Sequence, residues 1–63
     1  MNRAKLKGLR AEKGFTQEKI AEAIGIGVTT YILKEQGKRE FTESEISKLG
    51  DILNVNPSIF FVN

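Results

Sequence analysis

The sequence predicts a compact all-α fold of five short helices, and three observations support that prediction. Apolar residues recur at the three- and four-residue spacing of amphipathic helices, whereas no long segment alternates apolar and polar residues as a half-buried strand does. Glycine, proline and hydroxyl residues stand where such helices would begin and end. The chain has only 63 residues, which suffices for one small core. We therefore expect residues 1–63 to form a single domain.

The first two helices are predicted over residues 3–13 and 16–24. Each contains apolar residues at helical spacing. Thr16 can cap the second helix, because its hydroxyl can accept a hydrogen bond from an unpaired amide of the first turn. Gly14 and Gly25 follow the two helices, at the position where the backbone often turns left-handed.

The remaining helices are predicted over residues 28–36, over residues 42–53 and from Pro57 onward. Thr42 and Glu45 have the three-residue spacing of a capping box. Pro57 suits the first position of a helix, where no amide hydrogen is needed. Helices this short are not stable alone in water, so all five must share one core. The residues expected in that core are Leu6, Leu9, Phe15, Ile20, Ala21, Ile24, Tyr31, Phe41, Ile46, Leu49, Ile52, Leu53 and Ile59.

Composition excludes several classes of protein. The chain has no cysteine and no histidine, so neither a disulfide nor a Cys/His zinc site is available. Two common nucleophiles and bases are thereby removed, and no glycine-rich phosphate loop occurs, so we expect no enzyme, metal, cofactor or small-molecule ligand. The charged N-terminal segment is unlike a signal peptide, and no apolar stretch is long enough to cross a bilayer, which predicts a cytoplasmic protein without membrane contact.

Charges are distributed unevenly along the chain, although the net charge is only +2. Residues 1–13 carry five cations against one acid, a net charge of +4. Residues 34–39 carry three cations against one acid, and residues 40–63 carry four acids against one cation. Folding could gather the cations on one side, which would attract phosphate. An ordinary solvated surface accounts for the same distribution equally well.

Residues 16–37 predict a helix-turn-helix motif. Ala21 supplies a small side chain midway along the first helix, where two steeply crossed backbones approach each other. Gly25 lies four residues later, in a turn that requires positive φ, and Tyr31 is expected to face inward from the second helix. This crossing leaves the second helix projecting, in position to enter a major groove of DNA.

Nearly the whole chain resembles the Cro and repressor helix-turn-helix family, the Cro/C1 or xenobiotic-response-element type, of small phage and bacterial regulators. The resemblance implies a lambda-repressor-like domain that binds double-stranded DNA sequence-specifically and regulates transcription as a repressor does. The residues that carry the resemblance are Leu6, Arg10, Lys13, Gly14, Thr16, Gln17, Glu18, Ile20, Ala21, Ile24, Gly25, Glu35, Gly37, Lys38 and Arg39, and the run from Thr42 to Phe60 with Leu53, Asn54 and Val55.

The resemblance also assigns contacts to the DNA backbone. Gln17 takes the position from which the family donates to a phosphate, and the N-terminus of its helix favours an anion as well. Arg10 and Glu35 match a partly buried ion pair that ties the first helix to the third near the backbone. As alternatives, each of these residues is an ordinary solvated surface residue. The residues expected to bind phosphate are Thr16, Gln17, Arg10, Lys38 and Arg39.

Base reading is expected from the exposed face of the third helix, near its N-terminus. Only Thr29 there is a good polar reader, whereas the family often has polar residues at these positions. Val28 and Leu33 can contact thymine methyl groups, which predicts recognition that is biased toward A·T pairs and depends on DNA shape. Lys34 is expected to lie partly inside, where the family prefers an apolar residue. The expected base-reading positions are Gly27, Val28, Thr29, Ile32 and Leu33.

Two other interpretations of this helix stay open. An exposed apolar face at Val28, Ile32 and Leu33 can dock another protein, as in an anti-repressor or a regulatory module. In the second interpretation, a small rotation of the helix places Ile32 and Leu33 in the core.

Small helix-turn-helix domains read two half-sites one helical turn apart as dimers, so we expect a homodimer on a pseudo-palindromic operator, formed in solution or only on DNA. The expected dimer contact comprises Phe60, Phe61 and Val62, since the core is too small to hide two adjacent phenylalanines. In the alternative, Phe60 belongs to the core and Phe61 is merely partly exposed.

Overall fold

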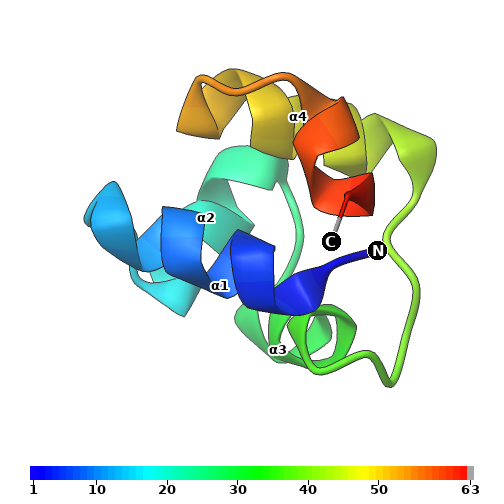
Figure 1. Ribbon diagram of the computed structural model, residues 1–63. Helices are drawn as coiled ribbons and strands as arrows, with labels where there is room; N and C mark the ends of the chain where they lie inside the picture. Colours follow the sequence, from blue (N-terminus) through cyan, green and yellow to red (C-terminus); the bar gives the residue numbers. More distant parts are fainter. Residues whose placement is uncertain (63) are drawn as a thin grey trace.

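The computed structural model describes residues 1–62, and these fold into four α-helices and a final 3-10 helix (Figure 1). The described residues contain no strand, so the predicted all-α class is confirmed, and the fifth predicted helix is a 3-10 helix. No helix within residues 1–62 is both long and apolar enough to cross a membrane. The helices are α1 (Arg3–Glu12), α2 (Gln17–Ile24), α3 (Val28–Glu35), α4 (Glu43–Leu53) and η1 (Pro57–Phe61).

Local capping signals set most of these helix ends. The Thr16 hydroxyl accepts a hydrogen bond from the backbone N–H of Lys19, 3.0 Å away, and so caps α2. Gly25 ends α2 with a φ of 81°, in the left-handed region that glycine adopts at little cost. Thr42 and Glu45 form the complete capping box at the start of α4. The predicted ends of these helices therefore agree with the structure to within a residue or two.

All the helices share one apolar core. Eight of the predicted core residues are buried, and the other five are partly buried against them. The ring centroids of Tyr31 and Phe41 lie 5.7 Å apart. Phe60 is fully buried as well, which agrees with the alternative interpretation of the sequence and not with its place in the expected dimer contact. The buried core consists of Leu6, Ile20, Ala21, Ile24, Tyr31, Phe41, Leu49, Leu53 and Phe60.

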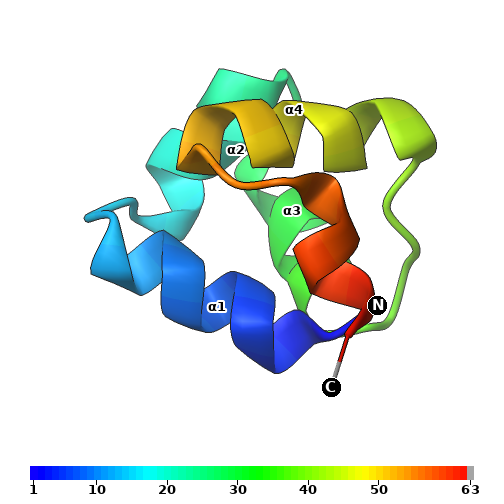
Figure 2. The ribbon, with the colours of Figure 1, turned by 45° about the horizontal axis from the view of Figure 1, so that its top comes forward.

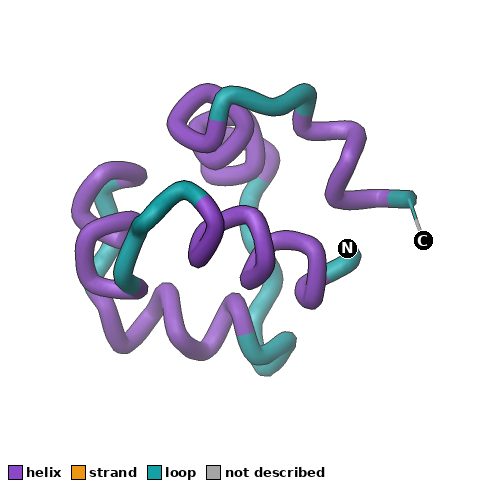
Figure 3. The backbone as a smooth tube through the Cα atoms, turned by 60° about the vertical axis from the view of Figure 1, so that its left-hand side comes forward, coloured by secondary structure: helices purple, strands orange, loops and turns teal. Residues whose placement is uncertain are grey.

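The helices lie around this core so that α3 and α4 occupy opposite edges of the molecule in the view of Figure 1. Figure 2 shows η1 directly below α4, and Figure 3 shows the loops that join the helices, of which the connection from α3 to α4, residues 36–42, is the longest. The two termini meet, because the backbone N–H of Asn2 donates to the Phe60 carbonyl and the Asn2 side-chain amide donates to the Val62 carbonyl, 3.0 Å away. Asn2 also caps α1 by accepting from the backbone N–H of Lys5.

The turn from α4 to η1 depends on Gly50. A methyl group at this position would lie 2.6 Å from Pro57 Cγ and 2.9 Å from the Val55 carbonyl oxygen. The Val55 backbone N–H donates to the Gly50 carbonyl over 2.9 Å, so the returning chain is pressed directly against the helix. Only glycine leaves room for this approach, which brings η1 and Phe60 back over the core.

Candidate nucleic-acid interface

The outer face of α3 is free of the core. Tyr31, Lys34 and Glu35 form the buried side of this helix. On the other side, Thr29 is exposed, and Val28 in the first turn is 37% exposed. Ile32 and Leu33 are half-buried, and within residues 1–62 neither belongs to the core cluster nor is among the partly buried residues that pack against it. The five positions expected to read bases, among them exposed Gly27, thus include no fully buried residue.

Three helices meet at the carboxylate of Glu35, whose residue is only 1% exposed. It accepts hydrogen bonds from Tyr31 Oη at 2.6 Å, from Gln17 Nε2 at 3.0 Å and from Arg10 Nε at 2.9 Å. Arg10 Nη2 lies 3.4 Å from the second carboxylate oxygen, and Arg10 Nη1 donates to the Phe15 carbonyl over 2.8 Å. The expected Arg10–Glu35 ion pair is therefore present, and it fixes α1, α2 and α3 relative to one another.

The donors around Glu35 determine its charge. Burial alone raises the pKa of the Glu35 carboxyl, but the hydrogen bonds from Tyr31, Arg10 and Gln17 and the Arg10 charge outweigh it and hold the pKa below its usual value. Burial and the neighbouring carboxylate raise the pKa of the Tyr31 hydroxyl far above its usual range, so this hydroxyl stays a donor. At neutral pH the junction consists of one carboxylate, one guanidinium and two neutral donors.

The start of α2 presents two polar groups assigned to phosphate. Gln17 is half-buried, and one hydrogen of its amide is used on Glu35. A primary amide carries two hydrogens, so the second can be donated elsewhere. Thr16 is exposed, and its hydroxyl accepts from the Lys19 backbone, which leaves the hydroxyl hydrogen for another acceptor. Both groups stand at a helix N-terminus, where partial positive charge favours an anion.

The loop after α3 holds the two other expected phosphate ligands. Lys38 and Arg39 are both exposed. Their backbone N–H groups donate to the Leu33 carbonyl at 2.9 and 3.3 Å, so the loop is tied to the last turn of α3. Gly37 enters the loop with a φ of 85°. The backbone that carries the two cations consequently keeps a fixed position relative to α3.

Lys34 forms a buried ion pair that sequence reasoning did not identify. The residue is 6% exposed, and its Nζ lies 2.6 Å from Glu45 Oε1. The same carboxylate oxygen accepts from the Thr42 backbone in the capping box. Burial by itself raises the pKa of the Glu45 carboxyl. The hydrogen bonds from Lys34 and from the Thr42 backbone lower this pKa by more, so that it lies below its usual value. The sequence shows this pair only as two opposite charges eleven residues apart. Such a spacing indicates an ion pair only once the fold is known.

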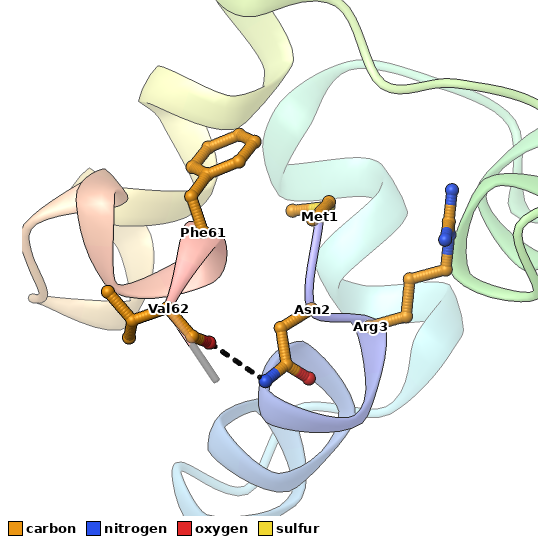
Figure 4. Close-up of a pocket in the computed structure, with 5 residues that line it drawn as sticks. All are labelled: Met1, Asn2, Arg3, Phe61 and Val62. Carbon is orange, nitrogen blue, oxygen red and sulfur yellow. Dashed lines mark hydrogen bonds between the residues drawn. The ribbon is translucent and has the colours of Figure 1, made fainter.

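The terminal residues form a separate exposed apolar surface. Phe61 is 60% exposed and Val62 is 50% exposed, whereas Phe60 points into the core and is wholly buried. Phe60 therefore does not belong to the expected three-residue dimer contact, because its ring is buried in the core, as the alternative interpretation of the sequence had it. Figure 4 shows Phe61 and Val62 beside the N-terminal residues, with the Asn2 amide donating to the Val62 carbonyl. A shallow hollow here is lined by Met1, Asn2, Arg3, Phe61 and Val62.

The arrangement of α2 and α3, with a short turn between them and an outer face left open, defines the class of protein. The chain belongs to the helix-turn-helix family of DNA-binding transcription regulators, in its Cro/C1-type form, and the family matches residues 6–60. A relative from Bacillus subtilis (strain 168) is YqaF, an uncharacterized HTH-type transcriptional regulator that is 43% identical over 61 residues. The alignment covers 97% of this chain and 80% of YqaF.

Proposed function

We propose that residues 1–63 act as one helix-turn-helix domain that reads double-stranded DNA sequence-specifically, with α3 in the major groove. The single observation that carries this proposal is the open outer face of α3 on a helix whose inner face is anchored at Glu35 and Lys34. A reading helix must be rigid on one side and free on the other, because base contacts demand a fixed register. Thr29 supplies the polar contact, and Val28 with Leu33 favours thymine methyl groups.

Phosphate contacts on either side of α3 set this register. Thr16 and Gln17 donate from the start of α2, and Lys38 with Arg39 donates from the loop. Arg10 acts through Glu35, because three of its donors are already engaged within the protein. Cationic contacts of this kind supply most of the salt-dependent, sequence-independent part of DNA affinity.

The protein binds a pseudo-palindromic operator as a homodimer, and the contact between the two copies is made by Phe61 and Val62. Their exposure of 60% and 50% supports this assignment, because adjacent large apolar residues at one surface point commonly mark a protein contact. Two copies read half-sites about one helical turn apart. A dimer bound over a promoter excludes polymerase from it, so the regulator acts as a repressor.

A second candidate function is supported by the same face of α3. Val28 is 37% exposed, and Ile32 and Leu33 are half-buried outside the core cluster of the described residues. Such an apolar strip on one helix can dock another protein, in which case the chain is an anti-repressor or regulatory module. The two candidates differ in whether the protein retains DNA.

The experiment is selection from a pool of random duplex DNA at two salt concentrations, followed by sequencing of the retained molecules. The proposal predicts an enriched pseudo-palindrome and affinity that falls steeply with salt. Thr29→Ala should relax base preference at one position in each half-site, whereas Gln17→Ala should weaken binding to all duplexes equally. Retention of no DNA at low salt would reject DNA reading and favour the docking function.

A further inference from the structure

Arg3 is not among the residues expected to bind phosphate, yet its surroundings are those of a phosphate ligand. It lies at the first position of α1, and its side chain extends away from Phe61 and Val62 in Figure 4. It reaches the loop after α3, where a methyl group on Gly37 would lie 3.0 Å from Arg3 Cζ. Lys38 and Arg39 follow Gly37 directly, so the Arg3 guanidinium lies against the loop that carries these two cations.

The guanidinium of Arg3 is poorly supplied with acceptors. Among residues 1–62 it makes no hydrogen bond, and its Nε is buried without a partner. Its only charged contact within residues 1–62 is with Glu40, whose oxygen lies 3.5 Å from Nη2, and the Glu40 side chain is 84% exposed. A pair this long and this exposed contributes little to stability. Arg10, by contrast, donates three hydrogen bonds to protein acceptors.

From these observations we propose that Arg3 binds a DNA phosphate by exchanging its contact with Glu40 for the phosphate oxygens. The proposal rests on the DNA-reading function above and adds a residue from α1 to the loop cations. A planar guanidinium can donate two parallel hydrogen bonds to a phosphate. The Glu40 carboxylate, 3.5 Å from Arg3 Nη2, does not receive such a pair of bonds. The guanidinium packs against Gly37 through Cζ and Nε, which orients it in advance, so little side-chain freedom is lost on binding.

The test compares Arg3→Gln with Lys48→Gln, which removes the same charge from an exposed position on α4. Affinity for the selected site and for random duplex is measured over a range of salt concentrations. Loss of one phosphate contact should reduce the slope of log affinity against log salt by about 0.9 and weaken both complexes alike. Lys48→Gln should leave the slope at the wild-type value. A folded Arg3→Gln protein with the wild-type slope would overturn the proposal.

Exchange with Glu40 has its own measurement. Glu40→Gln should tighten binding, and this gain should vanish when Arg3→Gln is also present. An equal gain in both backgrounds would mean a general charge effect and would overturn the exchange.

Arg3→Gln also removes the packing of Arg3 against Gly37, so a change in its DNA binding could come from an altered loop. A measurement on the wild-type protein avoids this ambiguity. Only three arginines occur in the chain, so their side-chain Nε–Hε signals are readily resolved by NMR. Addition of duplex DNA should shift the Arg3 signal more than the Arg10 signal. An unchanged Arg3 signal, alongside shifted backbone signals of Lys38 and Arg39, would overturn the Arg3 assignment alone. Absence of any DNA binding would overturn the proposed function and this inference together.

Discussion

Replacement of Glu35 by leucine tests the three-helix junction most severely. The Arg10 side chain is only 17% exposed, so loss of its counter-ion leaves a charge largely removed from water. Breaking such a pair on one side costs about 3–5 kcal/mol. The Tyr31 hydroxyl, 2.6 Å from the carboxylate, loses its acceptor too, at a further cost of about 1–3 kcal/mol. The expected loss of about 4–8 kcal/mol is comparable with the whole stability of about 3–9 kcal/mol for a chain of this length.

The companion variant removes all the stranded polar groups together: Glu35→Leu with Arg10→Met and Tyr31→Phe. Since well-packed apolar residues often replace a buried ion pair without loss, this triple variant should recover most of the stability. Circular dichroism during urea denaturation at neutral pH measures both proteins. The reasoning would be refuted by a Glu35→Leu protein that loses less than about 1 kcal/mol, or by a triple variant no more stable than the single one.

Three further predictions concern other parts of the molecule. Gly50→Ala should cost about 1–3 kcal/mol, because the new methyl group would lie 2.6 Å from Pro57 Cγ, and an unchanged melting temperature would contradict this. The lowered pKa of Glu45 stabilises the folded state, and this stabilisation is fully present when the pH is above the ordinary pKa of 4.5. It is lost as the pH falls through the lower pKa of the folded state. Glu45→Gln should therefore flatten the acid side of a plot of melting temperature against pH. Phe61→Ser with Val62→Ser should leave the melting temperature nearly unchanged but convert the DNA complex from dimer to monomer in sedimentation, and a surviving dimer would exclude this contact.

Helix boundaries could be predicted from the sequence because their causes are local. Thr16 caps a helix through an amide three residues away, and Gly25 ends it within the same turn. The capping box of Thr42 and Glu45 is equally local. Apolar periodicity identified eight of the nine buried core residues for the same reason. The ninth, Phe60, was expected in the core only as an alternative, because sequence spacing does not decide which of two adjacent phenylalanines a 3-10 helix turns inward.

Contacts between distant segments could not be predicted in the same way. The Arg10–Glu35 pair was expected only because a family resemblance supplied it. Lys34 and Glu45 become partners only when α3 lies near the start of α4, and Arg3 meets the loop at Gly37 only when α1 packs against α3. Each of these pairs joins residues that have many other possible partners in the sequence, so the fold itself selects them.

NMR titration of the wild-type protein with the selected duplex shows directly whether the outer face of α3 reads DNA. Backbone amide signals report on each residue separately. This mode of binding predicts that the largest shifts fall on Gly27 to Leu33, on Thr16 and Gln17, and on Lys38 and Arg39, while the exposed residues of α4 change little. Shifts concentrated on α4, or none on α3 when DNA is bound, would contradict it.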